Sequence, residues 1–338
     1  MIDLLVAGGG PAGLATAIHG ARAGLEVVVI ERRHGPVDKA CGEGLMPHAV
    51  ALLDSLGVQA PGKPFHGITY VDGRHRVTGR FRGSAGRGVR RTALHAGLLE
   101  AATGAGARIE HGDAGPVSQN ATSVRCSGFR ARYLAAADGL HSPVRAALGL
   151  TRPCAGPRRW GIRRHHLMTP WSDCVEVYWS DGAEAYVTPV ADDCVGIAIL
   201  TSRKGGFDEH LGAFPALQER VHSQPHGPDR AAGPLRQQVH NRAAGRVLLV
   251  GDAAGYVDAL TGEGLGIAFG AAQLLVDCVV AERPQDYDRR WRRMSSRYRM
   301  LTTAVLQASE MPVLRSRIVP VAARFPRVFR GIVNLLAE

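Results

Sequence analysis

The sequence has few cysteines and lacks any paired cysteine motif. Its six cysteines are spread over 338 residues, and no two of them have C-x-x-C spacing. The first residues, "MIDLLVAGGG", read directly as a strand, without the charged segment and apolar core of a signal peptide. We therefore expect a cytoplasmic protein whose thiols are reduced.

Acidic residues are scarce relative to basic ones. The chain has 41 Lys and Arg residues against 30 Asp and Glu residues, which gives a net charge of +11. The excess is almost all arginine, but it is dispersed, without a basic helix or an aromatic platform for nucleic acid. We therefore expect no nucleic-acid partner, whereas the 42 glycines predict loops whose backbone lies close to a small ligand.

Long uncharged apolar runs are absent as well. The longest apolar segment begins at Gly264 and carries Gln273 and Asp277 with helical periodicity, so it predicts a buried helix. From Pro312 to Leu336 the only charged residues are arginines, which alternate with apolar residues. We expect this C-terminal segment to flank the pocket mouth or to make a peripheral contact with an anionic membrane, with an ordinary packed helix pair as the alternative.

The sequence does contain a glycine fingerprint at its start. Gly8, Gly10 and Gly13 follow the apolar strand of residues 2–7 and open a helix, and Glu31 ends the next strand. Gly8 permits the tight turn, Gly10 lets a pyrophosphate approach the backbone, and Gly13 allows helix and strand to pack. Glu31 is placed to accept hydrogen bonds from the adenosine ribose. This βαβ unit predicts dinucleotide binding, with neighbouring contacts from Pro11, Ala12, Arg32 and Ala114.

Later segments favour FAD over NAD. "GDAAG" at residues 251–255 follows a strand and offers Asp252 to a ribityl hydroxyl, a group that NAD lacks. "ADGLHSPVR" adds a second acidic glycine turn, with Asp138 and Gly139. The segment "LTGEGLG" opens a helix whose amides suit the pyrimidine carbonyl of a flavin, through Gly262, Glu263, Gly264, Leu265 and Gly266.

The hydrophobic period changes along the chain. From residue 160 to 200 it is two, with Asp-Gly and Asp-Asp turns, which predicts antiparallel hairpins, and the parallel pattern returns at "RVLLVGDAAG". We predict an α/β fold with a Rossmann-like FAD-binding domain, an inserted substrate domain built on an antiparallel sheet, and C-terminal helices. The predicted boundaries are residues 1–70, 88–155 and 234–285 for the FAD-binding domain, 71–87 and 156–233 for the substrate domain, and 286–338 for the helices.

These segments carry a family resemblance. The order of the glycine fingerprint, D-G-x-x-S-x-V-R and G-D-A-A-G resembles the glutathione-reductase-type FAD fold of the aromatic-hydroxylase flavoproteins and the geranylgeranyl reductases. The resemblance implies a further FAD contact from Arg91 and places the Cys41–Gly42 turn beside the isoalloxazine ring. "CGEGL" and "LTGEGLG" look more like the reductases, because hydroxylases usually carry an Asn where this chain has Gly266. As in single-component hydroxylases, a second glycine fingerprint is missing, so NAD(P)H is expected to bind transiently.

The resemblance leaves the reaction open. Geranylgeranyl reductases tend to carry a Y-x-W-x-F-P-K run, of which "AYVTPVAD" keeps only Tyr186 and Pro189. The leading hypothesis is a monooxygenase that hydroxylates a lipophilic phenolic or polyketide-like small molecule with NAD(P)H and O2. The second is a reductase of isoprenoid or other alkene bonds, and the third is a flavin-binding protein without turnover. Cys41 and Tyr186 are the candidate catalytic residues, and plain packing is the alternative for the thiol.

A metal site is not expected. His165 and His166 are neighbours on a predicted strand, so only one of them can face the pocket. Further ligands at metal-binding spacing are missing, so both are interpreted as surface or core histidines.

Overall fold

Buried β-branched and alanine-rich runs build the first sheet. The computed structural model describes residues 1–154 and 156–338. β1 (Ile2–Ala7) pairs in parallel with β2 (Val27–Glu31) on one side and with β11 (Phe129–Ala136) on the other. The sheet has eight strands, and its main order is β19-β20-β11-β1-β2-β8. The other strands are β8 (Arg108–His111), β9 (Ser118–Gln119), β10 (Val124–Cys126), β19 (Ala243–Ala244) and β20 (Val247–Leu249).

Three helices pack together against this sheet. α1 (Pro11–Arg22) starts with a proline, which suits the first helical turn because proline has no amide hydrogen to satisfy. It contacts α3 (Arg91–Gly104) and α7 (Gly264–Val280). α7 is the buried helix that the sequence predicts, with Phe269 and Leu275 in the core. In the described part of the chain, no helix combines the length and the apolar character needed to span a bilayer.

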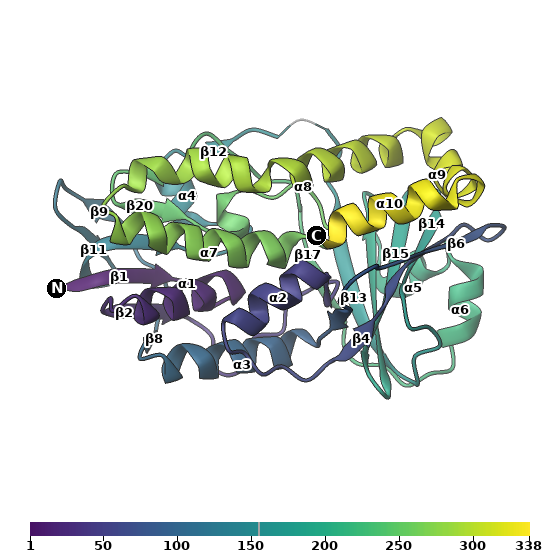
Figure 1. Cartoon of the computed structure of the whole chain (residues 1–338), viewed down its shortest axis with the longest axis horizontal. Coiled ribbons are helices and arrows are strands. Elements are labelled where there is room, and N and C mark those ends of the chain that lie inside the picture. The colour runs from purple at the N-terminus through teal and green to yellow at the C-terminus, as the bar shows by residue number, and fades with distance from the viewer. Residues whose placement is uncertain (155) are drawn as a thin grey trace.

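A second sheet forms the other half of the molecule (Figure 1). It has seven strands in the order β17-β13-β16-β15-β14-β5-β6. α5 (Phe207–Leu211) and α6 (Pro215–Val221) contribute Phe207 and Leu217 to an apolar cluster with this sheet. The strands are β5 (Gly67–Val71), β6 (Arg76–Arg80), β13 (Trp160–Leu167), β14 (Val175–Ser180), β15 (Ala183–Ala191), β16 (Cys194–Thr201) and β17 (Arg230–Ala232).

Two details of this sheet correct the sequence-based prediction. The predicted boundary between residues 70 and 71 falls inside β5, because β5 pairs with β6 along its whole length and with β14 from Ile68 to Val71. The pairing of β5 with β14 is parallel, so the sheet is not wholly antiparallel. Alternation along a strand reports which side chains are buried but does not report the direction of the neighbouring strand. The predicted boundary at residue 155 lies outside the described residues.

Short elements join the two halves. β3 (Gly44–Leu45) and β4 (Lys63–Phe65) both pair with β7 (Gly86–Gly88), next to α2 (Pro47–Ser55). These pairings bring the chain after Cys41 beside the second sheet. The remaining short elements are α4 (Pro143–Ala147), β12 (Thr151–Arg152), β18 (Gln238–Val239), η1 (Gly251–Ala254) and η2 (Pro284–Asp286).

The C-terminal segment is helical, as predicted. α8 (Tyr287–Glu310) runs along α7 and continues toward the second half of the molecule, where α9 (Pro312–Arg324) and α10 (Pro326–Ala337) follow (Figure 1). Phe329 and Val333 of α10 pack against Val77 of β6. The chain therefore ends on the edge strand of the second sheet.

Candidate functional site

The glycine turn between β1 and α1 has the geometry that the fingerprint predicts. Gly8 has φ +107°, and a Cβ atom there would lie 2.5 Å from the carbonyl oxygen of Ala137. At Gly13 a Cβ atom would lie 1.9 Å from the carbonyl oxygen of Gly8, so the turn and helix can meet only without side chains. Gly10 has open space where a Cβ atom would be, and Pro11 follows it as the first residue of α1. The start of α1 is thus open to a phosphate group.

Glu31 ends β2 beside this turn. Its carboxylate accepts hydrogen bonds from the backbone N–H of Gly9 at 2.8 Å and of Arg33 at 2.9 Å. A carboxylate has about four acceptor positions, so two stay available for ribose hydroxyls. β8 pairs in parallel with β2, so the loop that contains Ala114 begins at the same end of the strands as Glu31. Arg32 lies 3.9 Å from Asp113 in that loop.

Asp138 follows β11 and presents one free oxygen. Its Oδ2 accepts a hydrogen bond from the backbone N–H of Val144 at 3.0 Å, which fixes the start of α4. Its Oδ1 is buried and has no hydrogen-bond partner in residues 1–154 and 156–338. Burial raises the pKa of Asp138, and Gly139 follows it with φ +88°.

Arg91 and Asp252 bring opposite charges to the same cleft. Arg91 is the first residue of α3 and is buried, and its Nη1 has no hydrogen-bond partner among the described residues. Burial lowers the pKa of Arg91, while each of the two charges favours the ionised form of the other. Unpartnered buried polar groups are costly unless a ligand satisfies them. The open backbone at Gly10, the free Asp138 oxygen and the Arg91 guanidinium therefore fit the pyrophosphate and hydroxyl groups of FAD.

A buried acid in the "CGEGL" turn is the centre of the site that sequence reasoning missed. Glu43 is 3% exposed and has φ +58°, a left-handed conformation that is rare outside glycine. Its Oε1 accepts the backbone N–H of Arg91 at 2.7 Å, and its Oε2 lies 2.6 Å from Nε2 of His165. The Glu43 side chain therefore connects the turn before β3 to α3 and to β13.

His165 is fixed in one tautomer by its second neighbour. Nη1 of Arg163 lies 2.9 Å from Nδ1 of His165, and a guanidinium can only donate. Nδ1 is therefore the acceptor, and Nε2 carries the proton that is donated to Glu43. Arg163 also pairs with Asp38, whose other oxygen lies 3.0 Å from Nε of Arg230. The chain of groups thus runs from the buried turn to the partly exposed Asp38.

Cys41 lies in this turn, where its surroundings favour the protonated thiol. The backbone N–H of Glu43 donates to Sγ of Cys41 at 3.4 Å, and the hydroxyl of Thr188 on β15 donates to the carbonyl oxygen of Gly42 at 2.9 Å. Burial and then the Glu43 carboxylate raise the pKa of Cys41, against a smaller opposite effect of Arg91. A thiol with a raised pKa is a proton donor and not a ready nucleophile at neutral pH.

Tyr186 is anchored and does not offer a free hydroxyl. Its hydroxyl donates to the carbonyl oxygen of Leu260 at 3.0 Å, and burial raises its pKa well above the usual range. Leu260 belongs to the loop of residues 255–263, which connects η1 to α7. In the same loop Asp258 pairs with Arg159 at 3.3 Å, and Arg159 also pairs with Glu184. Tyr186 therefore holds this loop against the second sheet, and its catalytic role stays a prediction.

The start of α7 packs closely against α2. A Cβ atom at Gly266 would lie 2.2 Å from Nε2 of His48, which leaves no room for the Asn that hydroxylases usually have there. The Glu263 carboxylate lies 3.0 Å from His48 and is 3% exposed, so this side chain faces α2. Gly262 has φ +70° and Gly264 lies against the ring of Tyr256. Contacts of Gly262, Glu263, Gly264, Leu265 and Gly266 with FAD stay predictions, and for Glu263 and Gly266 they would come from the backbone.

Comparison with known proteins agrees with this geometry. The family model described as "FAD binding domain" matches residues 1–281. The chain belongs to this FAD-binding family. The menaquinone reductase of Mycobacterium tuberculosis is 31% identical over 328 residues, which cover 81% of this chain and 76% of that protein. Digeranylgeranylglycerophospholipid reductase 1 of Methanothermobacter thermautotrophicus is 27% identical, with 85% and 81% covered. The aurachin C monooxygenase/isomerase of Stigmatella aurantiaca is 26% identical, with 83% and 81% covered.

Solved structures show the same fold. A flavoprotein/dehydrogenase from Cytophaga hutchinsonii has a TM-score of 0.82 at 18% identity, covering 99% of this chain and 92% of that one. The halogenase PltM in complex with phloroglucinol and FAD has a TM-score of 0.73 at 16% identity, covering 86% and 72%. The predicted resemblance and the predicted fold class are therefore confirmed. The chain is a FAD-binding flavoprotein of an oxidoreductase family with both reductase and monooxygenase members.

The two adjacent histidines of β13 have separate surroundings. His165 faces Glu43, whereas His166 is buried near the rings of Phe207 and His226. Burial lowers the pKa of His166 to about 4. The described ranges contain no group of three or more side chains suited to hold a metal ion. The sequence did contain a signal for the Glu43–His165 pair. Glu43 stands in a glycine turn and His165 on an apolar strand, and a polar side chain that becomes buried in such a place needs a hydrogen-bond partner.

Proposed function

We propose that the chain is a FAD-dependent reductase of carbon–carbon double bonds in a lipophilic, isoprenoid-bearing substrate. The observation that carries this proposal is the place of the Cys41 thiol in a turn held by the buried Glu43–His165 pair. By the family resemblance, this turn passes beside the isoalloxazine ring. The names of the menaquinone reductase and the digeranylgeranylglycerophospholipid reductase among the relatives support a reductase.

Saturation of one double bond needs a hydride at one carbon and a proton at the other. A bound FAD that NAD(P)H has reduced supplies the hydride. Cys41 gives the proton to the other carbon, since its raised pKa keeps the thiol protonated until a stronger base forms. Arg91 and the Glu43 backbone N–H stabilise the thiolate that is left, and water in the cleft returns its proton.

Hydroxylation by a monooxygenase is the second candidate. The relative named aurachin C monooxygenase/isomerase favours it, and so does the incomplete aromatic run around Tyr186. The sequence alone put this reaction first. We place it second because a protonated thiol in the "CGEGL" turn has no evident task in adding an oxygen atom to a ring.

Anaerobic turnover separates the two reactions. The FAD-loaded protein is reduced with NADPH and incubated with a menaquinone or a lipophilic phenol, and products are measured by mass spectrometry. A reductase adds two hydrogens without air, whereas a monooxygenase needs air and adds one oxygen atom. Cys41→Ser should slow alkene reduction by about a hundredfold with FAD retained, because a serine hydroxyl is a much weaker acid. The exposed Cys154, changed to Ser, is the matched control. Unchanged turnover in Cys41→Ser would refute the thiol's role.

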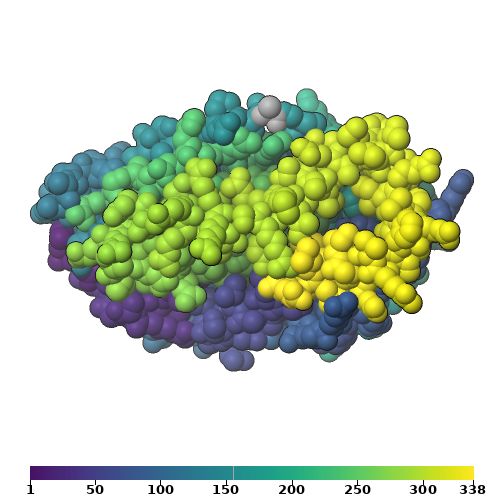
Figure 2. Space-filling view, turned by 45° about the horizontal axis from the view of Figure 1, so that its top comes forward, coloured from purple at the N-terminus to yellow at the C-terminus, as the bar shows by residue number. Residues whose placement is uncertain are grey.

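We also propose that α9 and α10 contact an anionic membrane surface that delivers the substrate. α10 buries Phe329 and Val333 against the second sheet, whereas Val328 and Ile332 of the same helix are 61% and 43% exposed, and Phe325, just before the helix, is 56% exposed. Apolar side chains left exposed beside the buried ones offer a surface to a second apolar partner. The C-terminal helices, in yellow, form one continuous part of the molecular face (Figure 2).

Charge decides which partner fits this surface. Between residues 312 and 337 the charged residues are all arginines, and Arg317, Arg324, Arg327 and Arg330 are exposed among the apolar side chains. Basic residues beside exposed apolar ones match an interface of anionic headgroups and acyl chains. Sedimentation with phosphatidylglycerol vesicles should recover the protein, and pure phosphatidylcholine should recover much less. Val328→Glu should weaken the binding, whereas equal recovery with both vesicles, or a dimer that hides this face, would refute the membrane contact.

A further inference from the structure

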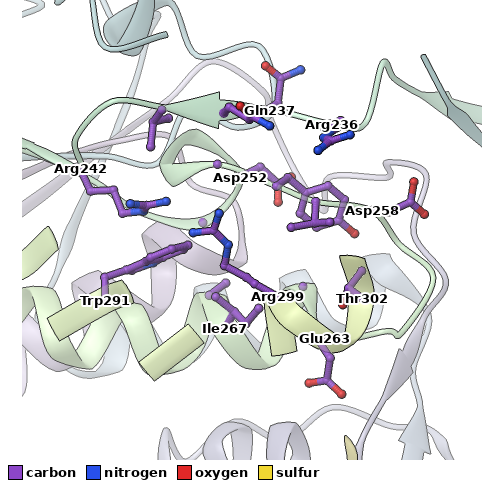
Figure 3. A pocket seen from close by; sticks show the side chains of 18 of the residues that line it. Arg236, Gln237, Arg242, Asp252, Asp258, Glu263, Ile267, Trp291, Arg299 and Thr302 are labelled. Carbon is purple, nitrogen blue, oxygen red and sulfur yellow. The ribbon is translucent and has the colours of Figure 1, made fainter. Parts of the chain in front are cut away.

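A cavity with an arginine-rich end lies between α8 and the segment of residues 236–242 (Figure 3). Its volume is about 270 Å³. It adjoins Asp252 and Gly264, which are predicted to contact FAD, and it extends from there to Trp291. Its guanidinium groups come from Arg152, Arg236, Arg242, Arg292 and Arg299.

Near Trp291, the guanidinium groups of Arg242, Arg292 and Arg299 outnumber the carboxylates that pair with them. Asp288 lies 2.8 Å from Arg242 and 2.6 Å from Arg292, so a single carboxylate forms ion pairs with two guanidinium groups. Arg299 has no ion pair in the described ranges. Its side chain points toward Arg242 across the cavity (Figure 3). Burial, followed by the neighbouring cations, lowers the pKa of Arg242 to about 10 and also lowers that of Arg299.

Trp291 fixes the orientation of the two facing guanidinium groups. The indole is 2% exposed, and the guanidinium carbons of Arg242 and Arg299 lie 3.5 Å and 5.3 Å from its ring centroid. Nε of the 3% exposed Arg242 and Nε1 of Trp291 have no hydrogen-bond partner within the described part of the chain. Stacked guanidinium groups with free N–H donors are preorganised to bind planar or tetrahedral anions.

Two of the three acidic residues that line the cavity have partners away from these arginines, and the third, Asp252, is predicted to contact FAD. Asp258 is paired with Arg159, and Glu263 is paired with His48. The partners of both carboxylates therefore lie outside the arginine cluster. The end near Trp291 keeps a net positive charge in a partly enclosed space, where an anion is bound more strongly than in open water.

We propose that this end of the cavity binds a phosphate or diphosphate group of a small molecule. Arg299 and Arg242 would contact the phosphate oxygens, since a guanidinium fork matches two such oxygens. The rest of the ligand would extend along the cavity toward Asp252 and Gly264. The phosphate could belong to a nicotinamide dinucleotide or to a prenyl diphosphate, and the two share this recognition chemistry.

Calorimetric titration of the FAD-loaded protein with inorganic pyrophosphate tests the site without any turnover. Arg299→Gln should weaken pyrophosphate binding at least tenfold. Arg289→Gln should leave it unchanged, because Arg289 pairs with Asp286 and does not line the cavity. Flavin absorbance shows that each variant is loaded. Equal affinity in Arg299→Gln, or no binding to wild type at millimolar pyrophosphate, would overturn the proposal.

Competition identifies the source of the phosphate. If NADPH displaces pyrophosphate and NADH does so at least tenfold less well, the group is the 2′-phosphate of the dinucleotide. Displacement by geranylgeranyl diphosphate and not by geranylgeraniol would assign the site to a prenyl diphosphate. Failure of the reductase proposal would leave both measurements intact, because neither depends on turnover.

Discussion

Replacement of Glu43 by Gln isolates the interaction that holds the "CGEGL" turn. The substitution keeps the size of the side chain and removes one acceptor oxygen. In the native protein the two carboxylate oxygens accept from the backbone N–H of Arg91 at 2.7 Å and from Nε2 of His165 at 2.6 Å. A glutamine amide can accept only one of these bonds. Its NH2 group must then face the other N–H, and His165 cannot switch tautomer because Arg163 donates to Nδ1.

The expected loss of stability follows from these two bonds. A hydrogen bond to a charged group contributes about 1.5–3 kcal/mol, and a buried donor left without an acceptor costs about 1–3 kcal/mol. Glu43 is 3% exposed and His165 is 6% exposed, so water cannot replace the missing acceptor. We therefore expect Glu43→Gln to lower the free energy of unfolding by about 2–4 kcal/mol.

Urea unfolding followed by circular dichroism, with FAD in excess, measures this loss. Glu110→Gln is the matched control, because Glu110 pairs with Arg108 on the surface at 3.3 Å and should cost at most about 0.5 kcal/mol. A double-mutant cycle with His165→Asn should give a coupling of about 1–3 kcal/mol. If Glu43→Gln loses less than about 0.5 kcal/mol, the pair does not hold the turn and the reasoning is wrong.

Three further predictions concern the cofactor, pH and packing. Glu31→Ala should weaken FAD binding by about 1–3 kcal/mol in a flavin fluorescence titration, and unchanged affinity would remove Glu31 from the ribose site. Burial raises the pKa of Asp258 to about 6, so the folded state binds the Asp258 proton more tightly than the unfolded state does. Protonated Asp258 therefore adds stability that is fully present below about pH 4. This stability is lost as the pH rises through 6. Between pH 4 and 7 the wild type should therefore lose up to about 2–3 kcal/mol more than Asp258→Asn, and parallel curves would contradict this. Gly266→Ala should cost about 1–3 kcal/mol in thermal unfolding because its Cβ atom would lie 2.2 Å from His48, whereas Gly104→Ala, with open space, should cost nothing.

The nucleotide-binding half was predictable because its features are local in sequence. The strand of residues 2–7, the turn at Gly8 and the acid Glu31 lie within 31 residues, so spacing and periodicity specify them. The buried helix from Gly264 followed from periodicity in the same way. The direction of pairing between β5 and β14 did not follow, because it depends on segments about a hundred residues apart.

The sequence by itself determined that the chain binds FAD. The cofactor is recognised largely by backbone turns, and the spacing of their glycines can be read directly from the sequence. The tertiary structure decided what surrounds the proposed flavin site. Glu43 and His165 are 122 residues apart, and Tyr186 is 74 residues from its partner Leu260. The pKa of Cys41 is likewise set by burial and by Glu43, and burial exists only after the second sheet packs against the turn. Side-chain contacts across two sheets depend on how the whole chain packs, so no local pattern encodes them.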